Sequence, residues 1–422
     1  MRELDIDVAI IGGGPAGLAA ALEVARAGRS AAILERNTEL GGILQQCIHD
    51  GFGVLRFGTS MSGCSYAQRF IDDIESARAD GARIEVLLDT MVLELTPDRE
   101  IWATNPADGM VHVRAGAVVL AMGCRERTAA QVLLHGHRPQ GVITAGAAQR
   151  YINVEGYLPG THAVILGSGD IGLIMARRMT LEGIEVEGVY EIMDHPGGLA
   201  RNIVQCLDDY GIPLHLSHMV SRVHGKHRLE GVTVVERGGD GRPIEGTERF
   251  IPCDLLVLAV GLIPENELSR ACGVELDPSS RGPLLDEAFM TSIPGVFAAG
   301  NVSIVYDLVD YVSESGELAA RGACAWLDAG RPSAEPVAAV ETSGNVGAFV
   351  PQRMRTEAGT SREVRFFCRV QRPAENVEVR CVVNGEVIAR ERHMAVAPAS
   401  MLSFSAEIPA GAVPTLEIVE VG

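Results

Sequence analysis

The sequence predicts an α/β protein in which two dinucleotide-binding folds stand in tandem, followed by a small antiparallel β-domain. A glycine-rich turn between an apolar run and an Ala/Leu-rich helix occupies residues 7–35, and the same pattern returns at residues 163–191. From about residue 364, apolar and polar residues alternate as in half-buried strands. A chain of 422 residues is long enough for two or three domains with substantial cores.

The first glycine-rich turn has all the parts of a dinucleotide-binding unit. An apolar strand at 8–11 leads into the turn, a helix follows, and a second apolar run ends at Glu35. The first glycine permits the tight turn, the second lets the backbone approach a pyrophosphate, and the third lets the helix pack on the strand. The helix N-terminus offers an anion site, and Glu35 can accept hydrogen bonds from a ribose. The turn contains Gly12, Gly14, Pro15, Ala16 and Gly17.

The second copy repeats more than the glycines. A strand at 163–166 leads into a turn, a helix follows at 173–182, and a strand at 186–191 ends in Glu191. Glu35 precedes the Gly-Gly pair at 41–42 by six positions, and Glu191 precedes the pair at 197–198 by the same six. These matched features predict a tandem duplication. The second turn contains Gly167, Gly169, Asp170, Ile171 and Gly172.

The remaining elements follow in order. We expect helices at 65–79 and from about 307 to 329, and short buried strands at 83–87 and 118–121. A linker begins near residue 330, and strands are expected at 364–370, 377–383, 386–392 and 415–421, with a hairpin turn at Asn384-Gly385. The predicted domains are residues 1–145 and 266–332 for one dinucleotide fold, 146–265 for the other, and 340–422 for the β-domain.

Composition excludes several classes of function. A formal charge of −19 and a pI near 5.0 argue against nucleic acid or an anionic membrane as the main partner. Lys226 is the only lysine, so a P-loop is absent. The sequence shows neither a membrane-length apolar run nor a signal-peptide pattern, which favours a cytoplasmic protein. Nine scattered cysteines without a CxxC pair argue against a disulfide framework and against a metal site.

Together with the segment TSIPGVFAAGN at 291–301, these motifs resemble the pyridine nucleotide–disulfide oxidoreductase superfamily over roughly residues 5–330. The resemblance implies a glutathione-reductase-like fold that binds FAD at the first glycine turn and NAD(P) at the second. Asn301 stands where the family usually has an acid that hydrogen-bonds the flavin ribityl chain, and an amide still offers an acceptor.

The resemblance also implies two sets of cofactor contacts. For FAD the residues are Gly12, Gly14, Pro15, Ala16, Gly17, Glu35, Arg36, Gly42, Met91, Val92, Ala121, Gly123, Gly300, Asn301, Leu308 and Val309. For NAD they are Gly167, Gly169, Asp170, Ile171, Gly172, Glu191 and Gly261. The helix that begins near Asp307 is expected to direct its N-terminus at the flavin.

Three segments resemble a narrower subgroup, found beside anaerobic-type glycerol-3-phosphate dehydrogenases. They are residues 41–49 (GGILQQCIH), 123–127 (GCRER) and 141–149 (GVITAGAAQ). More distantly they resemble the FAD/NAD-fold subunits of sarcosine oxidase, opine oxidase and hydrogen cyanide synthase. The resemblance implies two partners, a dehydrogenase subunit and a small cysteine-bearing redox protein; a homo-oligomer is a further possibility.

The candidate catalytic residues are Cys47, His49 and Arg127. Leu44 and His49 stand at the positions of the family's redox cysteine pair, so electron relay through a disulfide of this chain is disfavoured. Cys47 is a reactive thiol if its pKa is lowered, and His49 is a possible donor to substrate or flavin. The alternatives are a buried cysteine and a histidine satisfied by backbone. Arg127 either binds an acidic substrate or forms a structural ion pair.

We therefore expect an FAD-dependent oxidoreductase that exchanges hydride with NAD(H) and electrons with a partner subunit. Glu191 favours NAD over NADP, because a carboxylate accepts from a ribose diol and repels a 2′-phosphate. One alternative is the FAD subunit of an amine, opine or hydroxy-acid oxidase with a vestigial nucleotide site. Another is a scaffold that recruits partners through the C-terminal β-domain.

Overall fold

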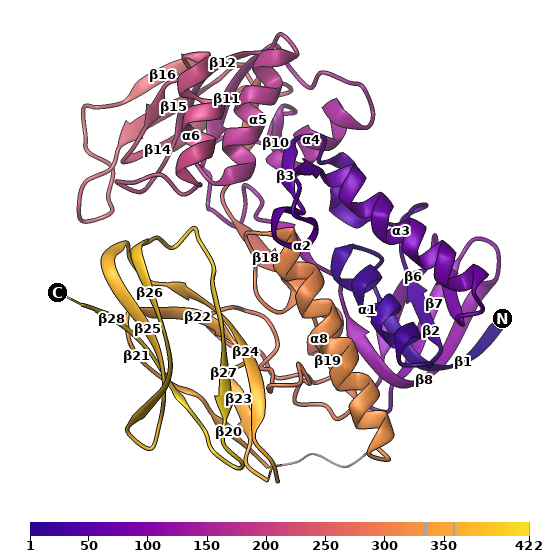
Figure 1. Cartoon of the computed structure of the whole chain (residues 1–422). Helices are drawn as coiled ribbons and strands as arrows, with labels where there is room; N and C mark the ends of the chain where they lie inside the picture. Colours follow the sequence, from indigo (N-terminus) through magenta and orange to yellow (C-terminus); the bar gives the residue numbers. More distant parts are fainter. Residues whose placement is uncertain (332–335, 358, 422) are drawn as a thin grey trace. The chain divides into compact units, whose positions relative to one another are not determined.

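The computed structural model describes residues 1–331, 336–357 and 359–421. The chain divides into two compact units, one made of Met1–Cys124 with Pro264–Gly422 and the other of Arg125–Ile263 (Figure 1). From the sequence we placed these crossings at 145/146 and 265/266, whereas the units divide at 124/125 and 263/264. Residues 332–335 of the expected linker lie outside the described part.

The first unit is built on a seven-stranded sheet with the order β5-β2-β1-β8-β7-β6, in which β19 also pairs with β8. Strands β5, β2, β1, β8 and β19 run parallel, and β7 and β6 continue the sheet antiparallel. The central strands are near-continuous Val, Ile, Leu and Ala, which suits a sheet buried on both faces. The strands are β1 (Arg2–Ile11), β2 (Ala31–Leu34), β5 (Ile84–Leu87), β6 (Met91–Leu95), β7 (Glu100–Asn105), β8 (Gly109–Leu120) and β19 (Val296–Ala298).

Helices and short elements complete this dinucleotide fold. The main helices are α1 (Pro15–Arg26), α3 (Gly63–Ala79) and α8 (Val309–Asp328). Between them lie the 3₁₀ helices η1 (Gly42–Gln46) and η3 (Gly300–Val302), the helices α2 (Val54–Phe57) and α7 (Glu267–Ala271), and the hairpin of β3 (Asp50–Phe52) with β4 (Met61–Ser62). We expected α8 to begin near Asp307, but its first residue is Val309.

The second unit repeats the plan on a five-stranded parallel sheet with the order β10-β17-β11-β12-β13. One face packs on α4 (Ala145–Asn153), α5 (Asp170–Leu181) and α6 (Ala200–Cys206). The other face packs on an antiparallel sheet of β14 (His218–His224), β15 (Gly231–Glu236) and β16 (Arg249–Pro252). The parallel strands are β10 (Val142–Thr144), β11 (His162–Leu166), β12 (Glu185–Tyr190), β13 (Leu214–His215) and β17 (Leu255–Leu258).

Two short strands, β9 (Cys124–Glu126) and β18 (Leu262–Pro264), fall where the chain passes from one unit to the other. Among the helices that the structure describes, none is both long and apolar enough to cross a bilayer.

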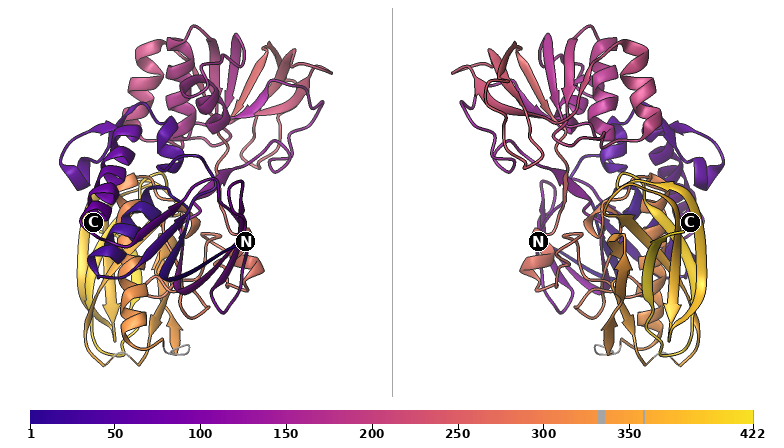
Figure 2. Two further views of the ribbon diagram at one scale, coloured as in Figure 1. Left: turned by 90° about the vertical axis from the view of Figure 1, so that its right-hand side faces the viewer. Right: turned by 90° about the vertical axis from the view of Figure 1, so that its left-hand side faces the viewer.

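The described C-terminal residues form three sheets around their own core, and Figure 2 shows them from two sides. The strand orders are β21-β28-β25-β26, β22-β24-β27 and β20-β23, and every pairing is antiparallel except that of β21 with β28. The four expected strands are confirmed as β24, β25, β26 and β28, and Asn384 and Gly385 both have positive φ, as a tight hairpin requires. Short strands before residue 360, and β27, were not anticipated. The strands are β20 (Val337–Ala339), β21 (Glu341–Gly344), β22 (Val346–Val350), β23 (Arg353–Arg355), β24 (Arg362–Val370), β25 (Ala374–Val383), β26 (Glu386–Val396), β27 (Leu402–Ile408) and β28 (Thr415–Glu420).

Helices α1 and α8 cross without space for a side chain at the contact. A Cβ added to Gly316 of α8 would lie 2.2 Å from the backbone oxygen of Ala16, in the first turn of α1. Gly300 also packs against Ala16, because its added Cβ would be 2.9 Å from Ala16 Cβ. The crossing therefore fixes where the first turn of α1 lies.

We predict that Gly316→Ala destabilises the protein by about 1–3 kcal/mol, although alanine is the better helix former, because the helices must separate to admit the methyl group. Urea unfolding of the full chain measures this loss. The reverse exchange on the exposed side of α8, Ala325→Gly, is the matched control and should cost about 1 kcal/mol. A Gly316→Ala protein as stable as the parent would contradict the tight crossing.

A buried ionic cluster joins residues 286–287 to the C-terminal strands. The Ala288 and Met290 amides each donate to Asp286 Oδ1 at 2.9 Å, while Asp286 Oδ2 lies 3.7 Å from Arg355 Nε. Glu287 Oε1 pairs with Arg355 at 3.1 Å and with Arg362 at 2.8 Å. Burial, reinforced by the neighbouring Glu287 charge, raises the pKa of Asp286 to about 7.

The pKa of Asp286 is higher in the folded chain than its ordinary value of 3.8, so the folded state holds the proton more tightly than the unfolded state. The free energy of unfolding therefore falls as pH rises from 3.8 to about 7. We predict that Asp286→Asn, which keeps one acceptor oxygen, reduces the loss of unfolding free energy between about pH 5 and about pH 8 by at least ~1 kcal/mol. Denaturant unfolding at the two pH values measures it. An unchanged pH dependence would contradict the raised pKa.

Candidate functional site

The first glycine turn lies against strand β8 at a distance that only glycine allows. Gly12 has φ of +110°, and an added Cβ would be 2.4 Å from the Ala121 backbone oxygen. An added Cβ on Gly17 would lie 1.9 Å from the Gly12 oxygen. Gly14 is different, because among the described residues no atom beyond its chain neighbours lies within 4 Å of its Cβ position. Packing thus requires two of the glycines, while the third faces open space.

Glu35 is buried at the end of β2, and its carboxylate closes the turn. The Gly13 amide donates to Oε2 at 2.7 Å, and the Asn37 amide donates to Oε1 at 2.8 Å. The Thr90 amide donates to the Glu35 backbone oxygen at 2.8 Å, which brings the segment that leads into Met91 and Val92 to the end of β2. A fixed carboxylate next to an open glycine face can accept ribose hydroxyls.

Other predicted FAD residues lie around the same turn. Gly42 approaches it, since its added Cβ would be 3.1 Å from Gly14 Cα, and Gly300 contacts Ala16. Helix α1 starts at Pro15 without a side-chain cap and without an acid in its first turn, which suits an anionic ligand. Arg36 is exposed, and Gly123 has open space at its Cβ position.

Asn301 is held by the protein on both sides of its amide. The Tyr306 amide donates to its Oδ1 at 3.0 Å, and its Nδ2 donates to the Cys124 sulfur at 3.7 Å. Leu308 and Val309 form the start of α8, which has no side-chain cap. Asp310 in its first turn is buried, and burial raises its pKa.

The second unit repeats the geometry of the first turn. Gly167 has φ of +101°, and its added Cβ would lie 2.2 Å from the Ala259 oxygen; that of Gly172 would lie 2.5 Å from the Gly167 oxygen. Gly169, like Gly14, has open space at its Cβ position. Helix α5 begins at Asp170 without a side-chain cap.

Glu191 corresponds to Glu35. Its Oε2 accepts from the Ser168 amide at 2.8 Å and the Ser168 hydroxyl at 2.6 Å, and its Oε1 accepts from the Met193 amide at 2.9 Å. Asp170 is directed elsewhere, because its Oδ1 accepts from the Leu199 amide at 2.8 Å and from Asn202 at 2.6 Å. That carboxylate therefore holds the start of α6.

Arg237 is a residue near this site that we did not predict. From the end of β15 its Nη1 donates to the Ile192 oxygen at 3.3 Å, next to Glu191. No local pattern signals this contact, because the residues are 45 positions apart. Gly261, which we did predict, has φ of +100°, and its oxygen accepts from the Arg127 amide at 3.0 Å.

The three candidate catalytic residues are not gathered in one compact unit. Cys47 and His49 follow η1 in the first unit, whereas Arg127 belongs to the second. The Cys47 thiol is buried and donates to the Ile43 oxygen at 3.4 Å, and burial raises its pKa to about 12. The His49 ring packs on Phe52, with centroids 5.1 Å apart. The lowered pKa that a reactive Cys47 requires is thus not provided.

We predict that Cys47 in the folded protein resists alkylation by iodoacetamide at about pH 8, because little thiolate is present. Peptide mapping by mass spectrometry measures the labelling of each cysteine. Cys64 is the internal comparison: its pKa is also raised by burial, but it is more exposed, so it should react first. Cys47 labelling that is faster than Cys64 labelling in the folded chain would indicate a reactive thiol after all.

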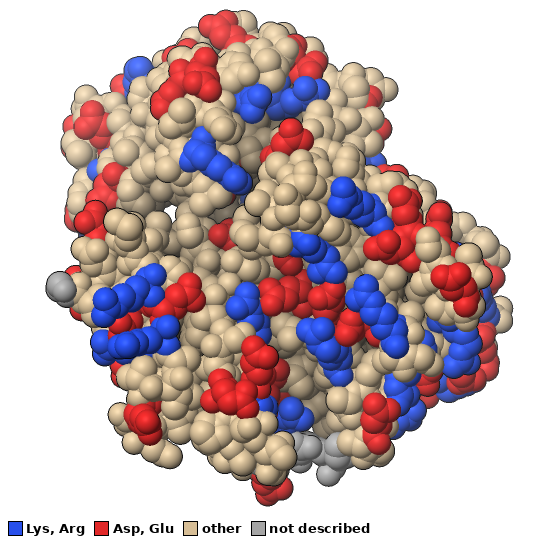
Figure 3. All heavy atoms as spheres, viewed as in Figure 1, with Lys and Arg blue, Asp and Glu red and all other residues tan. Residues whose placement is uncertain are grey.

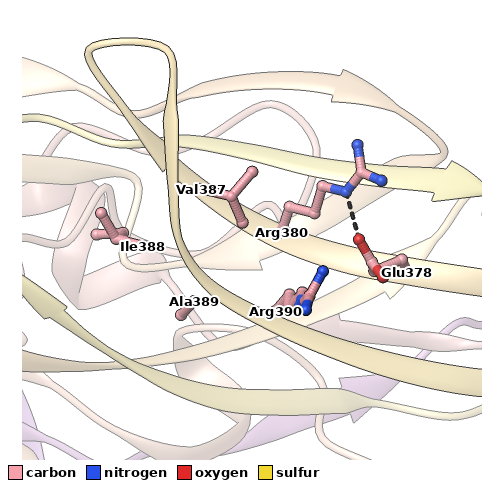
Figure 4. A pocket seen from close by; sticks show the side chains of 6 residues that line it. All are labelled: Glu378, Arg380, Val387, Ile388, Ala389 and Arg390. Atoms are coloured by element: carbon pink, nitrogen blue, oxygen red, sulfur yellow. Dashed lines mark hydrogen bonds and ion pairs between the residues drawn. The ribbon is translucent and has the colours of Figure 1, made fainter.

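A pocket on the C-terminal sheet contains none of the predicted residues (Figure 4). It has a volume of about 510 Å³ and is lined by residues of the paired strands β25 and β26. Glu378 accepts from Arg380 at 2.6 Å and from Arg392 at 2.9 Å, so both its oxygens are taken by arginines. Basic and acidic side chains are interspersed over this face (Figure 3). We interpret the cluster as a surface ion-pair network.

Two uncapped helix starts, each with an open glycine and a buried carboxylate, define a class of protein, the oxidoreductases with two dinucleotide folds. Residues 6–322 match the family model described as pyridine nucleotide-disulphide oxidoreductase, and the chain belongs to this family. It is accordingly an FAD-dependent NAD(P)H oxidoreductase with a thioredoxin-reductase-like α/β fold, and both turns leave the open space at their middle glycine that the approach of a pyrophosphate requires.

The chain is similar to components of larger enzymes. It is 27% identical over 322 residues to hydrogen cyanide synthase subunit HcnB of Pseudomonas protegens, covering 71% of this chain and 66% of HcnB. It is 27% identical over 338 residues to an opine oxidase subunit of Agrobacterium tumefaciens, covering 76% and 66% respectively. The chain thus spans about two thirds of these relatives.

Among solved structures, thioredoxin reductase of T. acidophilum matches with a TM-score of 0.60 at 25% identity. The match covers 76% of this chain and 98% of that one.

Proposed function

We propose that this chain exchanges hydride between NAD(H) and FAD and passes electrons to or from a partner dehydrogenase subunit. One observation carries the proposal: the same buried carboxylate-to-amide bond closes both glycine turns, Glu35 with Gly13 and Glu191 with Ser168. Two turns with the same geometry support two dinucleotides, one in each unit.

The chain's own residues would bind and orient these cofactors. In the first unit the uncapped start of α1 would face the FAD pyrophosphate, and the Glu35 carboxylate would accept hydrogen bonds from the hydroxyls of the adenosine ribose. In the second unit the start of α5 and Glu191 would do the same for the nicotinamide dinucleotide. When bound, the cofactors supply the hydride chemistry, and the protein contributes position and electrostatics.

Glu191 supports a preference for NAD(H). Its two carboxylate oxygens are fixed by three donors, so the negative charge cannot swing away from a 2′-phosphate. Arg237 is the opposing feature, because a cation next to Ile192 could reach such a phosphate. We place NAD(H) first because the carboxylate borders the turn itself.

The route beyond the flavin supports a partner subunit. The family's redox cysteine positions hold Leu44 and His49, and the buried Cys47 thiol remains protonated. The two relatives, HcnB and the opine oxidase protein, are themselves subunits by name. We therefore include a dehydrogenase of the glycerol-3-phosphate type and a small cysteine-bearing redox protein as the proposed partners.

A second candidate is an oxidase subunit whose nicotinamide site is vestigial, favoured by the similarity to the opine oxidase relative. The intact second turn argues for the first candidate, because Gly169 keeps an open face and Glu191 keeps its bonds.

We predict that NADH bleaches the flavin absorption band of the FAD-loaded chain under anaerobic conditions, at lower concentration than NADPH. Glu191→Gln should weaken NADH binding about 10- to 100-fold, the effect of losing a charged acceptor, and leave flavin content unchanged. Glu35→Gln is the matched control in the first turn, and it should lower FAD retention instead.

Reduction of the flavin by NADPH at lower concentration than by NADH would contradict the proposed preference for NAD(H). Bleaching by an amine or hydroxy acid, with none by either nucleotide, would support the oxidase candidate in place of our proposal.

A further inference from the structure

Strand β24 of the C-terminal β-domain presents one row of side chains to the start of helix α8. Residues two apart on a strand share a face, and on this face lie Arg365, Phe367 and Arg369. Each contacts the segment 305–314, which follows the second flavin motif at 291–301 and contains the first turns of α8. Figure 1 shows β24 beside α8.

Arg369 binds backbone oxygens of two separate segments. Its Nη2 and Nε donate to the Val305 oxygen at 2.9 and 3.3 Å. Its Nη1 donates to the Pro398 and Ala399 oxygens, each at 2.7 Å. A planar guanidinium can bridge carbonyls on two sides in this way, and a lysine ammonium cannot reproduce the fork. Arg369 thus ties residue 305 to the loop before β27.

Neighbouring contacts extend the same support. The Phe367 ring packs edge-on against Tyr306, with centroids 5.2 Å apart, and also against Tyr311 at 5.6 Å. Arg365 donates to Glu314 at 2.9 Å, and the Met401 amide donates to Asp307 Oδ2 at 2.8 Å. The C-terminal β-domain therefore contacts residues 306–314 through an ion pair, two aromatic contacts and a backbone hydrogen bond.

The support reaches Asn301 in a single further step. The residue after Val305 is Tyr306, whose amide donates to Asn301 Oδ1 at 3.0 Å. A shift of the Val305 carbonyl would move this amide, and Asn301 and the uncapped start of α8 would move with it. The family resemblance implies that both features face the flavin, whose adenosine end the function proposed above places at α1 and Glu35.

We propose that Arg369 is a positioning residue for the flavin site, acting through Val305 and Tyr306 on Asn301 and the N-terminus of α8. The inference rests on the proposed function, since it concerns the site assigned there to FAD. It gives the C-terminal β-domain a role in tuning the flavin in addition to any role in assembly.

The test compares the FAD-loaded full-length chain with Arg369→Lys and Arg369→Gln. Lys keeps the charge without the fork, and Gln removes both. The readouts are the flavin midpoint potential, the flavin fluorescence and hydrogen exchange of the Tyr306 amide. Arg372→Lys is the matched control, because Arg372 lies just after the same strand in an exposed pair with Glu420.

We expect both Arg369 variants to shift the flavin potential and fluorescence, and to exchange the Tyr306 amide at least about tenfold faster, while the control matches the parent. Folded Arg369 variants with unchanged flavin signals would overturn the proposal, whether or not amide exchange had changed. A failure of the proposed function is seen separately, as a parent chain that either binds no FAD or is not reduced by NADH.

Discussion

The close approach of Gly12 to the Ala121 carbonyl is the contact on which the first unit depends. With only 2.4 Å between that oxygen and the position of a Cβ, any side chain would lift the turn from β8. The Gly13 amide would then leave Glu35, and the first turn of α1 would lose its alignment. Because Ala16 in the first turn of α1 packs against Gly316 of α8, the displacement would also move α8. The contact between Gly12 and Ala121 thus fixes the glycine turn against β8, the bond of Gly13 to Glu35 and the crossing of α1 with α8.

The duplication preserves this constraint and also explains the six-residue spacing from acid to glycine pair. In the first unit the Gly41 amide donates to the Gly13 oxygen at 2.8 Å. In the second, the Gly197 amide donates to the Ser168 hydroxyl, also at 2.8 Å. The glycine pair therefore returns to the turn in both copies, once through backbone and once through a side chain. Ser168 also donates to Glu191, so the second turn has a polar link that Gly13 cannot provide.

Local patterns in the sequence predicted most of this architecture, because each part of a βαβ unit lies within a few residues of the next. The glycine turns and the four C-terminal strands are examples. No local pattern indicates the boundary at Cys124, which depends on contacts between distant segments, or the position of Arg237 beside Ile192. Whether the Cys47 thiol is reactive could not be predicted for a related reason. Its pKa depends on burial in the folded chain, which involves residues that are not adjacent to it in the sequence. The start of α8 was expected near Asp307, whereas the helix begins at Val309, because Leu308 has the extended backbone of an N-cap residue.

The C-terminal β-domain lies beyond the residues that match the family model, which end at 322, yet it contacts the family fold at both ends of α8. The chain enters the domain after Asp328, and β24 returns to Tyr306, Tyr311 and Glu314. A helix of 20 residues is roughly 30 Å long, so a domain attached only after Asp328 would leave the opposite end of α8, at Val309, free to move. The second attachment removes that freedom. Any partner that binds the C-terminal domain would thereby be mechanically connected, through Arg369 and Val305, to the segment that holds Asn301.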